Sequence, residues 1–394
     1  MERILMRWQA NSFTGWGVLG LNLFELWAAD PDIQPLMGAP FLPRNIAGLD
    51  PLRHAVLQPA IGVANQFAED IHAGKLDLRK LGAIAIDGIG NGFTPNVPRG
   101  NHVGLRNVAR CIFESTRMTN AQAIKGYDSV LCASRWSADL LRAATSIPVT
   151  MIHEGIDHSL FFPGPRSGVL DPDCFYVFTG GKIEFRKAQD VLILAFREFA
   201  RRHDDAVLVA AWGSDSPGSV AGFQGNLPAP LRTSSTGALD LRRWITECGI
   251  EPHQFIELPF MPNQLMPAVL REMDCALQVS RCEPCTNLPA KEAMACAVPV
   301  ILANNTGTRD LIDVDNCLSL TSQDPVRGEP GWDTGTDGWG ESRVDEIIAS
   351  LEKLYSDSQL RKRIGARGAE WILEKGRTWQ VHATALKAHL RSLL

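Results

Sequence analysis

The chain lacks the long apolar run that a membrane crossing requires. Its longest apolar stretches, such as Val191 to Phe196, stop far short of the roughly 20 residues that span a bilayer. The amino terminus shows no secretory pattern. We therefore expect a soluble, cytoplasmic protein.

Positive charge is not in excess. The chain has 39 Lys plus Arg against 44 Asp plus Glu, and residues 1–160 hold 14 of each sign. Without a basic excess there is no electrostatic footprint for nucleic acid and little support for an anionic-membrane anchor. We expect no nucleic-acid partner and at most peripheral membrane association, and the oligomeric state stays open.

The cysteine pattern favours neither a disulfide framework nor a zinc site. Nine cysteines, an odd number, are scattered along the chain, which is typical of reduced, buried thiols. Cys282 and Cys285 form a single CxxC, and no second CxxC or HxxxH completes a set of four ligands. We expect that pair to be structural.

The chain has enough hydrophobic residues to form several hydrophobic cores. A length of 394 residues with 45% hydrophobic residues indicates two or three domains. Short apolar strands alternate with amphipathic helical stretches in both halves, which predicts parallel α/β layers. The expected strands are 3–8, 33–40, 83–86, 108–113, 129–132, 174–178, 207–211, 254–258, 275–279 and 298–302, and the expected helices include 18–29, 136–144, 188–202 and 379–394.

Composition also marks the connections. Residues 162–168 are rich in Pro and Gly, so we place a domain boundary there. Residues 327–340 contain five Gly, one Pro and two Trp, which favours a surface excursion.

The first glycine turn, Gly15 to Gly20, fits GxGxxG between a strand and a helix, the arrangement of a dinucleotide-binding turn. A nicotinamide site also needs an acidic residue near the end of the second strand, and residues 33–40 contain none. Glycines at a helix amino terminus also suit a phosphate or a closely approaching sugar.

A cluster of cations follows the first strand of the second half. Lys182, Arg186 and Lys187 lie in the loop 180–187, directly before the helix expected at 188–202. Such a trio is often only a solvated loop. At the carboxyl edge of an α/β sheet, however, cations can neutralise a departing diphosphate.

The segment 280–296 offers two carboxylates around a polar turn. Glu283 lies in the loop after the strand expected at 275–279, and Glu292 lies about one helical turn inside the following helix. Backbone N–H groups of Thr286, Asn287 and Leu288 could bind phosphate oxygens there, while the two glutamates accept hydrogen bonds from hydroxyls.

Taken together, these segments resemble the retaining GT-B glycosyltransferases of family 4, the glycosyl transferases group 1. The resemblance rests on the stretch 283–292 followed by 298–301, on the loop 181–187 followed by Gln189 and Asp190, and on 153–157 ahead of Phe162. It implies two Rossmann-like parallel-sheet domains that face each other across a cleft. The implied domains are 1–165 for the acceptor, 166–375 for the donor, and a helix 376–394 that crosses back to the first domain.

The resemblance also implies a role for each matching residue. Lys182 and Lys187 would stabilise the diphosphate, with Arg186 as a further candidate, and Glu283 would meet the hydroxyls of the donor sugar. Glu292 would hold the nucleotide ribose, and Thr286 to Leu288 would cap the phosphates. Gly15 and Gly17 would face the donor from the first domain.

Two positions depart from the family pattern. The family glutamates usually lie eight residues apart, whereas Glu283 and Glu292 lie nine apart and Lys291 occupies the expected place. Many relatives have a histidine where this chain has Glu114, so the sugar preference can differ. His102 and Asp87 are alternative polar residues for that part of the first domain.

The implied reaction moves a sugar from a nucleoside-diphosphate sugar to a hydroxyl of a carbohydrate or glycoconjugate acceptor, with retention and without a metal. None of the motifs above contains an Asp-x-Asp pair, and polysaccharide assembly is a family-level expectation. A nicotinamide oxidoreductase using Gly15 to Gly20 and a non-catalytic sugar-nucleotide-binding protein are the alternatives.

Overall fold

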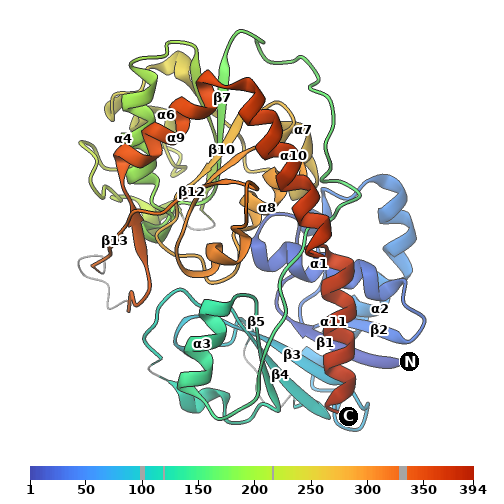
Figure 1. The fold of residues 1–394 in the computed structure, drawn as a ribbon. Helices are drawn as coiled ribbons and strands as arrows, with labels where there is room; N and C mark the ends of the chain where they lie inside the picture. The colour runs from blue at the N-terminus through green and yellow to red at the C-terminus, as the bar shows by residue number, and fades with distance from the viewer. Residues whose placement is uncertain (98–102, 119, 215–216, 328–334) are drawn as a thin grey trace. The chain divides into compact units, whose positions relative to one another are not determined.

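The computed structural model describes residues 1–97, 103–118, 120–214, 217–327 and 335–394 (Figure 1). They form two compact units. The first comprises Met1–Asp157, Pro262–Leu265 and Gly376–Leu394, and the second comprises His158–Met261 and Met266–Lys375. The domain boundaries predicted at 165/166 and 375/376 stay predictions, because compactness alone does not show which segments fold independently.

The first unit is built on a six-stranded parallel sheet with the order β2-β1-β3-β4-β5-β6. Its strands are β1 (Glu2–Arg7), β2 (Ile33–Met37), β3 (Ile84–Ile89), β4 (Arg106–Cys111), β5 (Ser129–Cys132) and β6 (Val149–Met151). Short apolar segments with buried side chains on both faces are typical of such sheets. The sequence therefore predicted the sheet class, although the short strand β6 escaped it.

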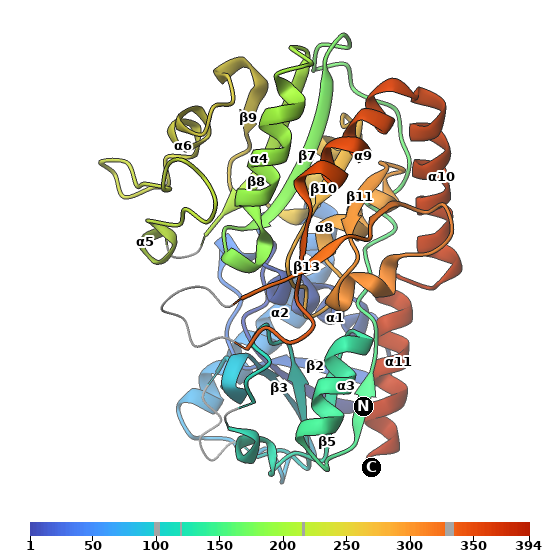
Figure 2. The same ribbon diagram turned by 60° about the vertical axis from the view of Figure 1, so that its left-hand side comes forward.

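Four α-helices accompany this sheet: α1 (Gly15–Ala28), α2 (Pro51–His72), α3 (Arg135–Ala144) and α11 (Trp379–Ser392). Among the described residues, the 3₁₀ turns of this unit are η1 (Pro43–Ile46), η2 (Asn91–Phe93), η3 (Ala121–Ile124) and η6 (Asn263–Leu265). Figure 2 shows α11 running along the unit near both chain termini. Lys387 of α11 donates to Asp30 at 2.7 Å and to Asp32 at 3.0 Å, so ion pairs fix the last helix to the end of α1.

The second unit repeats the plan with the strand order β12-β11-β10-β7-β8-β9, again all parallel. The strands are β7 (Phe175–Lys182), β8 (Ala206–Gly213), β9 (Phe255–Glu257), β10 (Cys275–Gln278), β11 (Val300–Ala303) and β12 (Leu318–Leu320). A separate antiparallel hairpin joins β13 (Gln323–Pro325) to β14 (Gly340–Ser342). The excursion predicted at 327–340 lies between these two strands, and its residues 328–334 are outside the described residues.

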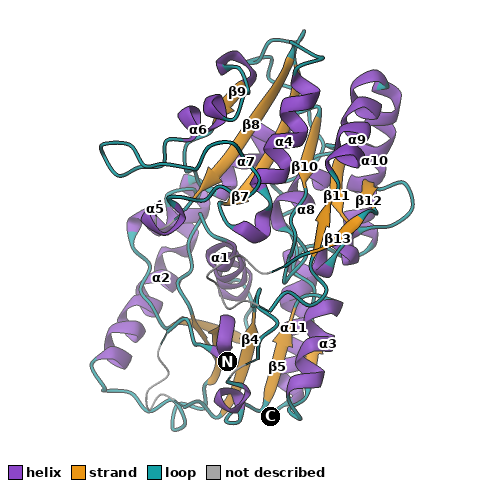
Figure 3. Cartoon of the chain, turned by 90° about the vertical axis from the view of Figure 1, so that its left-hand side faces the viewer, coloured by secondary structure: helices purple, strands orange, loops and turns teal. Residues whose placement is uncertain are grey.

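The helices of the second unit are α4 (Gln189–Ala200), α5 (Pro217–Val220), α6 (Leu241–Glu247), α7 (Met266–Leu270), α8 (Leu288–Ala295), α9 (Val344–Ser356) and α10 (Ser358–Glu374). Its 3₁₀ turns are η4 (Phe185–Lys187), η5 (Pro252–Gln254) and η7 (Thr306–Leu311). Figure 3 shows these helices around the strands.

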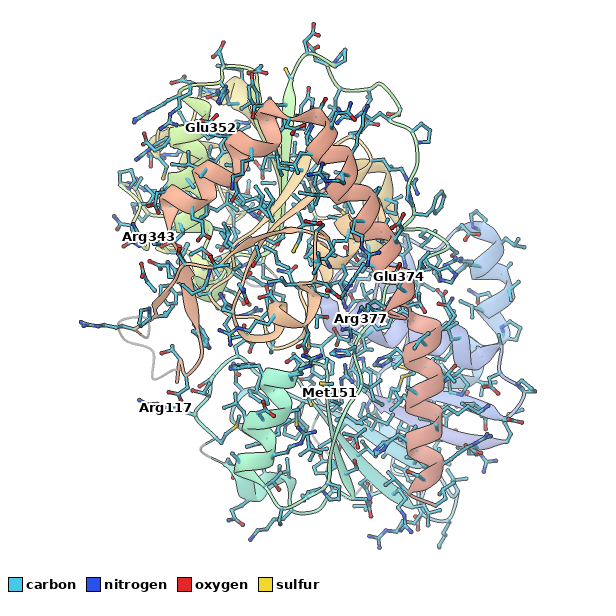
Figure 4. The ribbon with its side chains drawn as sticks, viewed as in Figure 1. Arg117, Met151, Arg343, Glu352, Glu374 and Arg377 are labelled. Atoms are coloured by element: carbon cyan, nitrogen blue, oxygen red, sulfur yellow. The ribbon has the colours of Figure 1, made fainter. Side chains whose placement is uncertain are left out.

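One face of the second sheet forms a large apolar core with α4, α6 and α9. Phe196 and Phe199 of α4, Trp244 of α6 and Leu351 of α9 are all buried in it. Glu352, labelled in Figure 4, accepts hydrogen bonds from the chain just after α4 and so ties α9 to it. This packing holds α4 and α9 together against the sheet.

All nine cysteines are free thiols in this structure. Seven are buried, and burial raises the pKa of several, to about 12 for Cys111, Cys296 and Cys317. Cys174 and Cys285 are the two that are partly exposed. Thiol reagents should therefore reach those two first.

None of the helices in the described part of the chain has the length and apolar character needed to cross a membrane. Among the same residues, no three His, Cys, Asp or Glu side chains gather in a way that could hold a metal ion. Cytoplasmic location and metal independence stay predictions.

Candidate functional site

The cation loop, residues 183–187, follows β7 and leads into α4. Lys182 is exposed at the end of β7, while the side chains of Arg186 and Lys187 are each only 12% exposed. Arg186 Nε lies 2.7 Å from Glu184, so one cation of the predicted trio is paired within the loop. Ala188 then enters α4 with φ = 55°, a left-handed conformation that is costly for a residue with a Cβ.

Glu283 is the carboxylate on which the cations converge. Its Oε1 accepts a hydrogen bond from Lys187 Nζ at 2.6 Å and from Ser280 Oγ at 2.6 Å. Its Oε2 lies 3.3 Å from Arg186 Nη1. Two of the three predicted cations, Arg186 and Lys187, therefore meet the first predicted glutamate at the carboxyl edge of the second sheet.

Electrostatics keep Glu283 ionised despite its burial. Burial alone would raise the pKa of its carboxyl group, but the positive charges of Lys187 and Arg186, with the hydrogen bonds from Lys187 and Ser280, hold the pKa below its usual value of 4.5. A negative charge among the cations limits their net positive charge. The loop therefore carries less excess charge than its sequence suggested.

The backbone of Glu283 is fixed by the 3₁₀ turn η7, which follows β11. Its N–H donates to Thr306 Oγ1 at 2.8 Å, and its carbonyl accepts from the N–H of Gly307 at 2.9 Å. A side chain at position 307 would lie 1.7 Å from the carbonyl oxygen of Cys285, so only glycine permits this close approach. The loop 280–287 is therefore held rigidly.

Asn287 begins α8 and connects it to the carboxylate. Its Oδ1 accepts from the N–H of Ala290 at 3.0 Å as a helix cap, and its Nδ2 donates to Glu283 Oε1 at 3.0 Å and to Gln278 Oε1 at 3.4 Å. Its φ of 54° is tolerated better by asparagine than by most residues. This turn lies between the two glutamates, which are nine positions apart.

The turn before α8 has unused hydrogen-bonding groups. Thr286 is fully buried, and its Oγ1 has no partner among the described residues. Gln278 Nε2 is buried without a partner in the same way. Because buried polar groups are normally paired, such groups point to a ligand that completes the bonding.

Glu292 lies within α8 and is 4% exposed, and Lys291 beside it is fully buried. Glu292 is therefore in the same helix and loop system as Glu283, as its sequence position implied. The contacts that would assign it to a ribose involve a bound nucleotide, so its role stays a prediction.

Packing within the first unit explains two glycines of the turn from Gly15 to Gly20. A side chain at Gly17 would collide with Asn11, and one at Gly20 would lie 2.6 Å from Trp8 Nε1. Gly15, at the first position of α1, faces open space among the described residues. Since two of the three glycines serve packing and no acidic residue follows β2 before Pro40, the dinucleotide alternative is not favoured.

The other first-unit residues lie in or beside strand ends. The N–H of Glu114 donates to Asn91 Oδ1 at 2.8 Å, just after β4. Asp87 is 1% exposed and is held by Arg7 at 3.2 Å and by the Tyr127 hydroxyl at 2.6 Å, so its carboxylate binds within the unit. His102 lies outside the described residues.

Sequence reasoning missed a buried arginine, Arg281, in the loop that also carries Glu283. Arg281 is 1% exposed and bonds both carboxylate oxygens of Asp190. Asp190 belongs to the motif formed by the loop 181–187 with Gln189 and Asp190. Its pairing with Arg281 could not be predicted, because the two residues lie 91 positions apart in the sequence.

Comparison with known proteins finds one family that matches part of the second unit. Residues 165–322 match the family described as Glycosyl transferases group 1. No curated protein sequence shows significant similarity to the chain.

Solved structures share the fold over the whole chain. A sucrose-phosphate synthase from Thermosynechococcus elongatus matches with a TM-score of 0.68 and 15% identity, over 100% of this chain and 99% of that one. HepE of Anabaena, solved with UDP-glucose, matches with a TM-score of 0.64 and 16% identity over 100% of both chains. A glycosyltransferase from Rickettsia africae matches with a TM-score of 0.62 and 12% identity, over 100% and 98%. The chain therefore has the predicted fold of two Rossmann-like domains.

Proposed function

Because residues 165–322 match the glycosyl transferases group 1 family, we propose that the chain is a glycosyltransferase that takes its sugar from a nucleoside-diphosphate sugar. The contact of Lys187 and Arg186 with Glu283 carries the proposal. It combines cations for a diphosphate with a carboxylate for sugar hydroxyls at one sheet edge, where α/β proteins bind ligands.

The turn before α8 supports a phosphate position. The N–H groups of Thr286, Asn287 and Leu288 precede the first intrahelical bonds of α8, and helix amino termini favour anions. The unpartnered Thr286 hydroxyl adds a further donor. We assign these groups, with Lys187 and Arg186, to the diphosphate.

The remaining assignments complete the donor site. Glu283 receives hydrogen bonds from the donor sugar, and Glu292 from the nucleotide ribose. Lys182 adds positive charge at the end of β7. Gly15, Gly17 and Glu114 are assigned to donor binding from the first unit.

The proposed reaction retains the anomeric configuration and uses no metal. The bond between the anomeric carbon and the diphosphate breaks as the acceptor hydroxyl attacks from the same face. The hydroxyl proton passes to the leaving phosphate oxygen, and negative charge grows on the diphosphate. Fixed cations and backbone N–H groups stabilise that charge, which is where the largest rate contribution is expected.

The acceptor is a hydroxyl of a carbohydrate or glycoconjugate, and polysaccharide synthesis is the proposed setting. HepE of Anabaena was solved with UDP and with UDP-glucose, so UDP-sugars are the first donors to test here. Release of the nucleoside diphosphate from a panel of nucleotide sugars would identify the donor. A protein that binds the nucleotide sugar but never releases the diphosphate, with or without acceptors, would instead be a binding protein.

Two thiols in the second unit offer a direct test of the site. Cys285 lies between Glu283 and Thr286, whereas Cys174 immediately precedes β7 at the opposite edge of the same sheet. Both are partly exposed, and the other seven cysteines are buried. A bound donor should therefore shield Cys285 from a thiol reagent and leave Cys174 unchanged.

The labelling experiment uses the Cys174→Ser and Cys285→Ser variants to assign the two reactive thiols. We expect a saturating nucleoside diphosphate to slow the labelling of Cys285 alone. Equal labelling of Cys285 with and without a nucleotide that demonstrably binds would reject this placement of the site.

A further inference from the structure

Arg281 lies in the loop after β10, two residues before Glu283, and the roles proposed above leave it unused. It is 1% exposed, and burying a charged side chain is costly unless its hydrogen bonds are satisfied. Its contacts are therefore informative about what the loop must hold in place.

The first set of contacts grips the cation loop. Arg281 Nη1 donates to the carbonyl of Phe185 at 2.6 Å, and the guanidinium carbon lies 4.2 Å from the centre of the Phe185 ring. The backbone N–H of Arg281 donates to the carbonyl of Arg186 at 2.7 Å. These bonds fix the residues directly before Lys187.

The second set anchors the guanidinium on two carboxylates. Asp190, in the first turn of α4, is fully buried and receives Nη1 at 2.9 Å and Nη2 at 2.8 Å. Glu341 of β14 receives Nε at 2.6 Å and is 33% exposed. Burial alone would lower the pKa of Arg281, but its bonds and charge attraction to Asp190 and Glu341 raise the pKa. The arginine therefore stays charged in the buried loop.

One side chain thus joins the loop before Lys187, the first turn of α4, the loop that carries Glu283 and the hairpin strand β14. Within the described part of the chain, the side-chain hydrogen bonds of Arg281 go to Phe185, Asp190 and Glu341, and none goes to Lys187 or Glu283. It holds the backbone segments from which both extend. An error of about 1 Å in such positions can cost roughly a hundredfold in rate.

We propose that Arg281 is a positioning residue that sets Lys187 and Glu283 at the spacing required by the donor diphosphate and its sugar. This inference rests on the proposed function. Lysine cannot replace the arginine, because one ammonium group cannot bond Asp190 through two parallel bonds while also reaching Phe185 and Glu341.

The test compares affinity for UDP with affinity for uridine, or for the matching pair if the donor panel identifies another base. In Arg281→Lys, UDP affinity should fall by about tenfold or more, while uridine affinity should change by less than about threefold. A role in folding alone would lower the folded fraction and leave the ratio of the two affinities unchanged.

Arg361 provides a matched control in the same unit. It also lies near a buried aspartate, Asp274 at 3.7 Å, over a phenylalanine ring, Phe175 at 5.4 Å, and donates to the carbonyl of Tyr355 at 3.1 Å. Phe175 begins β7, so this arginine is at the opposite edge of the sheet. Arg361→Lys should lower the melting temperature without changing the ratio of affinities.

Glu341→Gln serves as a milder variant if Arg281→Lys does not fold. It keeps the bonds to Asp190, so we expect a selective loss of UDP affinity of about two- to threefold. If the ratio of UDP affinity to uridine affinity is unchanged in folded Arg281→Lys and Glu341→Gln, the proposed role of Arg281 is wrong. It is also wrong if Arg361→Lys changes this ratio as much as Arg281→Lys does. Absence of nucleotide binding by the unsubstituted protein would contradict the proposed function itself.

Discussion

Replacing Lys187 by alanine removes the cation that lies 2.6 Å from Glu283 Oε1 in a site where the two side chains are 12% and 5% exposed. Loss of one preorganised charged donor typically lowers kcat by about 10²–10³. We expect a loss of this size in initial rates of nucleoside diphosphate release. Lys362→Ala, which removes an exposed lysine from α10, should leave the rate unchanged.

Lys187→Ala should also alter the pH dependence of kcat/KM. Lys187 is the strongest of the charges that hold down the pKa of Glu283, against its burial. Without Lys187 the folded-state pKa rises, so the acid limb of kcat/KM should move to higher pH. Lys187→Arg should recover part of the rate because it keeps the charge. Full turnover by a folded Lys187→Ala protein would refute the role of this lysine in catalysis.

Three further predictions concern binding and stability. Glu292→Gln should weaken nucleoside diphosphate binding by roughly 1–3 kcal/mol, and unchanged calorimetric affinity would reject the ribose role. Gly155→Ala places a Cβ about 2.1 Å from the Thr378 carbonyl carbon at the start of α11, so it should destabilise the protein by about 1–3 kcal/mol. The control Gly62→Ala, in open space on α2, should be neutral or stabilising. Burial raises the pKa of Glu25 to about 7, so its folded state holds a proton that the unfolded chain releases near 4.5. Stability from this group is then lost as pH rises from about 4.5 to 7, and Glu25→Gln should stabilise the protein at pH 8 by on the order of 2–3 kcal/mol. Chemical unfolding at pH 5 and pH 8 measures the free energy of unfolding of both proteins. If the difference between pH 5 and pH 8 is the same for Glu25→Gln as for the unsubstituted protein, the role of Glu25 is wrong.

The strands were the most predictable part of the fold. The apolar run within β8 and the alternation of strands with helices required only local sequence. The helix α2 was missed because Pro59 interrupts it and because Leu52, Val56 and Val63 are exposed. These residues blur the contrast between a buried and a solvated face on which such predictions depend.

The candidate site was predictable as a set of residues but not as a set of contacts. Lys187 and Glu283 were selected because each follows an expected strand of a parallel sheet and lies in a motif that resembles the family pattern. Their ion pair joins residues 96 positions apart, and only the register of β7 beside β10 brings them together. Arg281 and Asp190 are also far apart in the sequence, so no local pattern predicts their pairing.

The most direct test of the account is a crystal structure of the protein with the nucleoside diphosphate of its donor bound. We predict phosphate oxygens within hydrogen-bonding distance of Lys187 Nζ and of the N–H groups of Thr286 to Leu288. A nucleotide held at the turn from Gly15 to Gly20, with Lys187 and Glu283 in contact with none of it, would contradict the account.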